Sequence, residues 1–479
     1  MRHNIIYLMT AILPLCGCTD WLMVQPRGVE VPSGIEHYEG LLYGTELVTI
    51  REVFPYMCFE NTCDREGYEN MFTLAGESAC NAYLWKDDIF RRDEECTEWN
   101  FPASSMYTVN VVVNGVMQAE DGTDEEKLAV LSEARMVRAY MHFLMAQFFG
   151  KPYDPATASQ DLCVPIITTA STTETDFPRR TVEDVYGFIL KEMEESVGNL
   201  PDRVHHHKRV FRTAGYAMLG KVYWMMGRYE DALEPFGKAI ETLRSTSADG
   251  IFLDYNSMVS DGRITYPTDD RLNPEQIYNI ESMYLLYHAM YPTYYGSTLI
   301  YIKPEAMQRY YTDTDDLRLT FISGMESGVS PYGGTFDMNE KYHFGINRIV
   351  TNIGITSPDL YLMYAECLAR TGHESDAVAL LEELRSRRLP SGQAAVPAES
   401  SSGDALVKFS LEERMRENLG YGLSWFDMRR LWNDPLFQDM KQMYVHTDGE
   451  QEYTLSEQRL VMRIPPAILA WHPDYTDNE

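Results

Sequence analysis

The sequence lacks the features that several common classes of protein require. Its 479 residues include 41 Lys and Arg against 72 Asp and Glu, and this net charge of −31 argues against a nucleic-acid partner. No Cys-x-x-Cys pair with partner histidines is present, so a zinc site is not expected. The signatures G-x-S-x-G, H-E-x-x-H and G-x-x-x-x-G-K-S/T are also absent. We therefore expect no cofactor, no metal and no enzyme of these classes.

Long apolar runs are missing too, with one short exception at the N-terminus. Ile5 to Leu15 is too short to span a bilayer and has the form of a secretory signal. It ends in Leu15-Cys16-Gly17-Cys18, which resembles a bacterial lipobox. We therefore expect residues 1–17 to be a signal peptide, Cys18 to carry the lipid and residues 18–479 to form a single domain. The alternative is an ordinary signal peptide with a chance Gly-Cys.

Cysteines are few, and their spacing does not define a disulfide framework. An exported protein is able to form disulfides. Cys58 lies close in sequence to Cys63, and Cys80 to Cys96. Their connectivity stays open. The six cysteines after Cys18 are Cys58, Cys63, Cys80, Cys96, Cys163 and Cys367.

Amphipathic helices dominate the pattern that is present. Thr123 and Glu126 form a capping box, and Gly150 marks the end of the helix that it opens. Thr181 and Asp184 open another helix. The apolar stripe of the first is Leu128, Leu131, Met141, Met145 and Phe148, and that of the second is Val182, Tyr186, Ile189, Met193 and Val197.

Two later segments carry the tetratricopeptide pattern of paired helices. The spacing of seven residues from Gly220 to Gly227 recurs from Ala365 to Gly372, and each is followed five residues later by an alanine. The number of residues between these two alanines, Ala232 and Ala377, is not a multiple of the 34-residue repeat. We therefore expect a mainly α tetratricopeptide-type helical superstructure, with repeat helices at about 120–245 and 355–432, that long insertions interrupt.

The insertions, at about 45–110 and 250–350, differ in composition from the repeats. The first is rich in turn formers, aromatics and cysteine, and the second in Tyr, Gly, Asp and Pro. Irregular segments on a rigid scaffold are the usual carriers of binding function. We expect them to form a less regular, loop-rich, ligand-binding half.

A series of short motifs, in this order, resembles the SusD/RagB family of outer-membrane nutrient-binding lipoproteins. The motifs are Cys18, Asp20, Trp21-Leu22 and Pro26; Tyr107 and Asn114; Glu133-Ala134-Arg135, Arg138-Ala139-Tyr140 and Phe149-Gly150; Asp316-Leu317-Arg318; Ala365-Glu366; Glu413-Arg414, Glu417, Gly422, Trp425, Asp427 and Arg430; and Ile464-Pro465. Tyr421 and Ser424 depart from the family pattern, which has Glu and Arg there, and we expect an ion pair to be missing. The charged motif residues on the helices suit interhelix ion pairs, because buried charges persist only when paired.

The resemblance implies a function and a partner. Family members lie on a SusC-like TonB-dependent outer-membrane barrel, bind glycans or other nutrients and pass them to the barrel. It therefore implies a lipid-anchored protein of the outer membrane, facing the exterior. The alternative that we keep is a lipid-anchored tetratricopeptide scaffold for a peptide or protein ligand, and a secreted glycoside hydrolase is a more distant one.

Ligand contacts are expected in two loop regions, one before the Tyr107 helix and one after the Asn273–Ile277 segment. Aromatic rings stack on sugar C–H faces, and polar side chains bond the hydroxyls. The favoured candidates are Trp85, Trp99, Asn100, Tyr291, Tyr294 and Tyr295, and the weaker ones are Tyr83, Arg91, Tyr284 and Tyr287. The alternative for each is that it packs under its own loop.

Two clusters of charged or titratable residues are weaker candidates for metal sites. Consecutive residues such as His205, His206 and His207 do not converge easily on one metal ion, so a solvated loop is expected. Asp313, Asp315 and Asp316 have oxygen-rich spacing but lack the glycine and final glutamate of a calcium loop. We expect a charged surface loop there, and calcium binding stays open.

Overall fold

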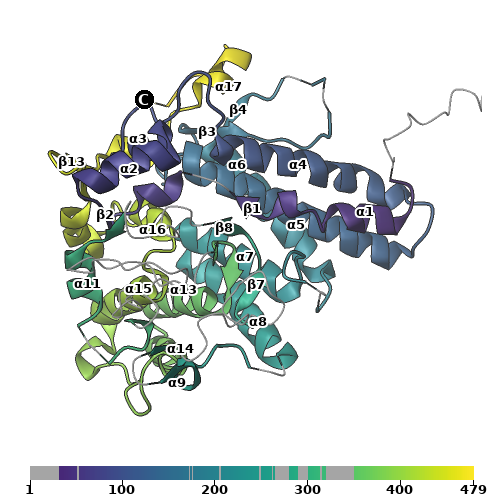
Figure 1. Ribbon diagram of the computed structural model, residues 1–479. Helices are drawn as coiled ribbons and strands as arrows, with labels where there is room; N and C mark the ends of the chain where they lie inside the picture. Colours follow the sequence, from purple (N-terminus) through teal and green to yellow (C-terminus); the bar gives the residue numbers. More distant parts are fainter. Residues whose placement is uncertain are drawn as a thin grey trace, which may run out of the picture.

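The computed structural model describes residues 32–50, 53–171, 173–174, 176–203, 206–247, 250–260, 263–264, 280–289, 300–312, 315–319 and 350–478 (Figure 1). Helices make up most of these ranges, as the mainly α prediction required. None of the helices within them is long and apolar enough to cross a bilayer. Cys18 and the signal segment lie outside the described residues.

The longer helices form an array of antiparallel pairs that runs from the top right to the bottom of Figure 1. Helices that follow one another in the sequence pack against each other. Shorter helices cover the side of the array where α2 and α16 lie. The helices are α1 (Ile35–Leu41), α2 (Arg65–Ala75), α3 (Glu77–Tyr83), α4 (Thr97–Gly115), α5 (Asp124–Phe149), α6 (Val182–Ser196), α7 (Arg212–Met225), α8 (Tyr229–Thr246), α9 (Tyr255–Met258), α11 (Pro304–Tyr310), α13 (Ser357–Arg370), α14 (Glu374–Arg385), α15 (Gly403–Asn418), α16 (Ser424–Arg430) and α17 (Pro466–Trp471).

Side-chain caps fix the starts of the helices as the sequence predicted. The Glu126 amide donates to Thr123 Oγ1 over 3.2 Å, and the Thr123 amide donates to Glu126 Oε2 over 2.7 Å. Thr181 caps α6 in the same way through the Asp184 amide. One predicted core position is wrong: Leu128 is 38% exposed, because α5 becomes buried only from Val130 onward.

The tetratricopeptide pattern corresponds to the helix pairs α7–α8 and α13–α14. Gly220 permits the close approach of the first pair, since a Cβ there would meet the Phe236 ring at 2.4 Å. Ala232 and Ala377, the alanines of the two patterns, are fully buried. The prediction of two helix pairs at these positions is therefore confirmed.

The two pairs pack against each other although a long insertion separates them in sequence. The Phe236 and Tyr364 rings lie 6.0 Å apart between α8 and α13. Trp224 on α7 donates its indole hydrogen to Glu366 Oε2 on α13 over 2.9 Å. The array therefore continues from α8 directly into α13.

Short strands connect the two insertions. β1 (Thr49–Ile50) pairs in parallel with β8 (Tyr287–Ala289), whose other edge pairs with β10 (Val350–Asn352). β2 (Asn61–Thr62) pairs with β9 (Tyr301–Ile302). The other strands are β3 (Leu162–Pro165), β4 (Arg179–Thr181), β5 (Val259–Ser260), β6 (Arg263–Ile264), β7 (Ser282–Tyr284), β11 (Ile355–Thr356), β12 (Val445–Thr447) and β13 (Glu452–Thr454). Residues 49–50 of the first insertion thus lie beside residues 287–288 of the second, and residues 61–62 beside residues 301–302.

Buried ion pairs join the helices of the array, as expected for the motif residues. Glu192 on α6 accepts from both Arg135 and Arg138 on α5. Arg414 on α15 bonds Asp359 over 2.8 Å and also pairs with Asp427. Other buried ion pairs include Arg209–Glu133, Arg318–Asp316, Arg318–Glu413, Arg385–Glu413, Arg388–Glu417, Arg370–Glu366 and Arg430–Glu366.

Ser424, where the family has an arginine, serves a buried carboxylate. Its hydroxyl donates to Glu60, and the Gly420 amide also donates to Glu60 over 3.2 Å. Burial raises the pKa of Glu60, while these hydrogen bonds oppose the rise. Ser424 thus supplies a neutral donor to this buried carboxylate.

Candidate ligand-binding face

An aromatic stack lies under the loop that follows α3. The His446 ring lies between Trp85, with ring centroids 3.8 Å apart, and Tyr83, at 4.4 Å. Trp85 is 4% exposed and donates its indole hydrogen to the Met57 carbonyl over 2.9 Å. Both faces of this arrangement are occupied by protein, so in this structure the rings of Trp85 and Tyr83 offer no surface to a sugar.

The surroundings of His446 keep the stack neutral. Its Nε2 lies 3.1 Å from the Cys58 carbonyl oxygen, and its Nδ1 faces the Tyr83 carbonyl. Burial, followed by the charge of Lys303, holds the pKa of His446 well below its usual range. Trp85 has a φ of 49°, a left-handed conformation that is rare for a bulky residue and costs on the order of 1–3 kcal/mol. The packing of its ring therefore holds the backbone in a strained turn.

Two more of the aromatic candidates lie in the core. Trp99 is 6% exposed and meets Phe149 edge to face at 5.0 Å. Tyr284 is fully buried against Tyr140. The alternative that these side chains pack within the protein accounts for their positions.

The structure does not test whether the other tyrosine candidates contact a ligand. Tyr291, Tyr294 and Tyr295 lie outside the described residues. Tyr287 contributes backbone to β8, opposite Thr49 and Asn352. Contact of these four residues with a ligand stays a prediction.

The 86–95 loop, which follows the stack, presents charged side chains to solvent. Ile89 and Phe90 are buried beneath it, and Asn81 Nδ2 donates to the Ile89 carbonyl over 3.2 Å. Asp87 pairs with Arg459 at 3.1 Å, and Asp88 with Arg463 at 2.9 Å. A well-anchored loop of this kind holds polar groups at the surface in fixed positions.

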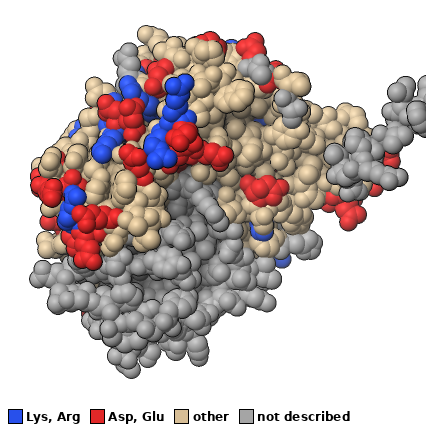
Figure 2. Space-filling view, turned by 45° about the horizontal axis from the view of Figure 1, so that its top comes forward, with Lys and Arg blue, Asp and Glu red and all other residues tan. Residues whose placement is uncertain are grey.

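Some polar side chains of this face have no partner among the described residues. Lys86 and Arg92 on the loop and Asn100 on α4 are exposed and make neither ion pairs nor side-chain hydrogen bonds there. Arg91 is also exposed but lies near Glu77 and Asp93, at 3.7 and 3.5 Å. Figure 2 shows that acidic and basic side chains are interspersed on one face of the molecule, not separated by sign. Of the predicted polar contacts, Asn100 and Arg91 are therefore available to a ligand.

The most exposed aromatic residue among the described ones was missed by the sequence reasoning. Trp471, on α17, is 83% exposed. The segment before it is joined to the 86–95 loop through Arg459 and Arg463, and Tyr475 after it lies 6.4 Å from Trp99. No motif marked Trp471, because α17 follows the closing Ile464-Pro465 motif and its apolar residues do not distinguish a buried from an exposed ring.

The described residues contain no group of His, Cys, Asp and Glu arranged to hold a metal ion. Asp316, expected in a charged surface loop, is instead buried and bonds the Arg318 guanidinium at 2.7 Å. Its carboxylate is needed to neutralise a buried arginine, which the aspartate spacing alone did not reveal. His205 and Asp313 lie outside the described residues. All six described cysteines are buried.

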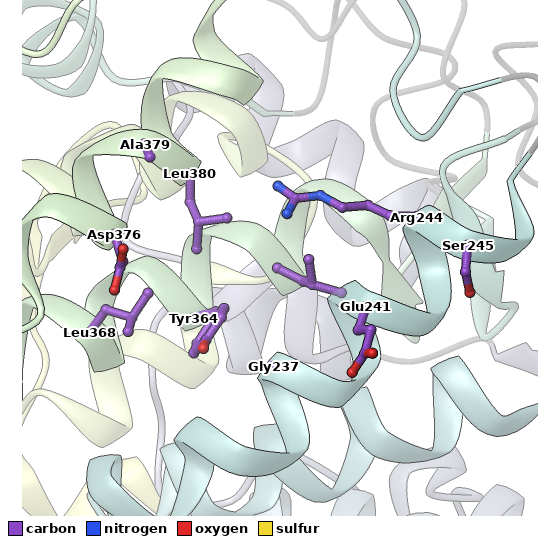
Figure 3. A pocket seen from close by; sticks show the side chains of 10 residues that line it. Gly237, Glu241, Arg244, Ser245, Tyr364, Leu368, Asp376, Ala379 and Leu380 are labelled. Atoms are coloured by element: carbon purple, nitrogen blue, oxygen red, sulfur yellow. The ribbon is translucent and has the colours of Figure 1, made fainter.

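A hollow lies in the helical array, formed by residues distant in sequence from the 86–95 loop. It measures about 640 Å³ and is open to solvent between α8, α13 and α14. It is lined by Gly237, Ile240, Glu241, Arg244, Ser245, Tyr364, Leu368, Asp376, Ala379 and Leu380 (Figure 3).

Comparison with known families finds two matches in separate parts of the chain. A family described as starch-binding and associating with the outer membrane matches residues 49–224. The SusD family matches residues 358–464. A SusD-like protein P38 from Formosa agariphila is 23% identical over 350 residues, which are 63% of this chain and 66% of that protein.

Solved structures resemble nearly the whole chain. A SusD superfamily protein from Bacteroides vulgatus superposes with a TM-score of 0.69 at 16% identity, over 93% of this chain and 99% of the other. A laminarin-binding SusD-like protein superposes with a TM-score of 0.61 at 16% identity, over 92% and 98%. At this level of identity the likeness shows the fold.

Proposed function

The chain belongs to the SusD family, and from that premise we propose that it is a cell-surface lipoprotein that binds a glycan and passes it to a partner TonB-dependent barrel. Members of this family are binding proteins associated with the outer membrane. The order of the family's motifs along the chain is the observation that carries the proposal. The laminarin-binding neighbour and the starch-binding description favour a glucan.

The described polar side chains suit a ligand rich in hydroxyl groups. Lys86, Arg92 and Asn100 are exposed and unpaired among the described residues, so they offer donors that sugar oxygens accept. The pairing of β1 with β8 supports a site that also includes residues 291–295, where Tyr291, Tyr294 and Tyr295 would supply stacking surfaces. We propose no catalytic residue.

We predict that Lys86→Ala, Arg92→Ala and Asn100→Ala together weaken glycan binding by about tenfold or more, since each lost charge-assisted or neutral hydrogen bond contributes about 0.5–3 kcal/mol. Isothermal titration against a panel that includes laminarin and starch oligosaccharides measures the affinity of the mature protein. Lys408→Ala, an exposed lysine on α15, is the matched control and is expected to bind as the wild type does.

The same samples are analysed for hydrolysis products. Saturable binding without products agrees with the proposal. Products from a purified sample, or the absence of binding to every glycan of the panel, would contradict it.

The anchor and the partner are tested in membranes. We expect metabolic labelling with an alkyne fatty acid to mark the wild-type chain, and Cys18→Ala to remove the label and move the protein to the soluble fraction. We expect the wild-type chain to copurify with a TonB-dependent barrel from detergent-solubilised outer membrane. An unlabelled wild-type protein would exclude the anchor, and a chain that purifies alone would exclude a stable complex.

A further inference from the structure

The hollow between α8, α13 and α14 is built from residues that the proposed glycan site does not use. Its floor is aliphatic, with Ile240, Leu368 and Leu380 buried at its base. Tyr364 lies across the middle, as Figure 3 shows. Gly237 keeps the floor open, because a Cβ there would lie only 3.2 Å from the Tyr364 hydroxyl.

Two carboxylates stand on opposite sides of this floor. Glu241 on α8 and Asp376 on α14 are both exposed, and Figure 3 shows them on the two sides of Tyr364. Neither side chain has an ion pair or a hydrogen bond with any residue that the structure describes. Two unneutralised carboxylates beside an apolar surface attract a cation that carries an apolar stem.

The single cation of the lining is already neutralised. Arg244 donates from Nε to the Tyr361 hydroxyl over 3.1 Å, and its Nη2 pairs with Glu383 at 2.5 Å. Its guanidinium therefore does not satisfy Glu241 or Asp376. The groove has an acidic rim over an aliphatic base.

We propose that this groove is a second binding site, which takes an extended peptide segment with a Lys or Arg side chain flanked by aliphatic residues. The aliphatic neighbours would cover Ile240, Leu368 and Leu380, and the cation would lie between Glu241 and Asp376. A glucan brings no charge to neutralise the two carboxylates, and the aliphatic floor favours apolar neighbours over hydroxyl groups. The partner is thus a protein with an exposed basic segment, not the nutrient.

The test uses two synthetic peptides and the full mature protein. The probes are acetylated and amidated pentapeptides in which Lys or Glu is flanked by leucines, titrated by isothermal calorimetry. We expect saturable binding of the lysine peptide only, weakened about tenfold by Glu241→Gln with Asp376→Asn. Affinity is expected to fall as salt rises from about 50 mM to about 500 mM.

The matched control is Glu234→Gln, which removes a carboxylate from the same helix, outside the groove, where it pairs with Lys238. It is expected to leave the affinity for the lysine peptide unchanged. Equal binding of the two peptides, no saturable binding, or no effect of the double variant would overturn the proposal. The Lys86, Arg92 and Asn100 variant is expected to bind the lysine peptide normally, so that a failure of the glycan proposal is distinguishable from a failure of this one.

Discussion

Replacement of Arg430 by Met is expected to destabilise the protein by about 3–5 kcal/mol, the usual cost of removing one partner of a buried ion pair. The side chains of Arg430 and Glu366 are 2% and 1% exposed, and two hydrogen bonds of 2.9 Å join them. The guanidinium also lies 3.8 Å from the centre of the Trp224 ring. One side chain on α16 thus connects α7 and α13, and its loss leaves a buried carboxylate short of a partner.

The pH dependence of this effect follows from the carboxylate. Burial alone would raise the pKa of Glu366, but the charges and hydrogen bonds of Arg430 and Arg370 outweigh it and lower the pKa to about 2. A depressed carboxyl pKa stabilises the fold fully above the unfolded value of about 4.3, and that stabilisation is lost as pH falls toward 2. The difference between wild type and Arg430→Met should therefore be largest at neutral pH and shrink below about pH 4.

Urea unfolding at pH 7 and at pH 3 measures both effects. Arg228→Met is the matched control, because Arg228 pairs with Asp231 near the surface at 42% exposure and such pairs contribute about 1 kcal/mol or less. Glu366→Gln added to Arg430→Met should restore part of the stability, since the amide keeps an acceptor for Trp224 without a charge. An Arg430→Met protein as stable as the control would show that the pair contributes nothing.

Trp85→Ala is expected to cost about 3–5 kcal/mol, the range for truncating a buried tryptophan. The change removes the ring that covers His446 and the hydrogen bond to Met57. It also empties the space beneath the 86–95 loop.

Trp85→Phe separates a packing role from a ligand contact. Phenylalanine keeps a ring on His446 and loses the hydrogen bond, so we expect a smaller cost of about 1–3 kcal/mol. Glycan affinity, measured well below the unfolding temperature, should stay within about twofold of wild type, a difference of about 0.4 kcal/mol. A folded Trp85→Phe protein that has lost its glycan affinity would instead place the ring in the binding site.

Local sequence signals predicted the helical part of the fold well. Caps such as Thr123 with Glu126, and the small residues at Gly220 and Ala232, act within one helix or one helix pair, so their spacing is enough to locate them. The motif charges were assigned to ion pairs because a buried arginine needs a carboxylate, and Arg135, Arg138, Arg414 and Arg430 all have one. The direct contact of α8 with α13 could not be predicted, because it joins positions more than a hundred residues apart.

The candidate site was less predictable, for a physical reason. An aromatic residue in an irregular segment is equally able to stack on a ligand or to pack under its loop, and composition does not distinguish the two. Trp85 and Trp99 have the character of stacking platforms but lie in the core, whereas Trp471 at the end of α17 is exposed. Burial depends on which distant segment covers a ring, and for Trp85 that segment holds His446.

The junction of α8 with α13 has a consequence for the order in which the chain folds. The face of α8 that packs on α13 is covered only when the residues from Ser357 onward are present. These residues follow the whole 250–350 insertion. The pairs α4–α5 and α7–α8 are able to form early from local contacts, but the apolar surface of α8 stays exposed until that distant closure. The late closure makes this surface the place where an incompletely folded chain would bind a chaperone or aggregate.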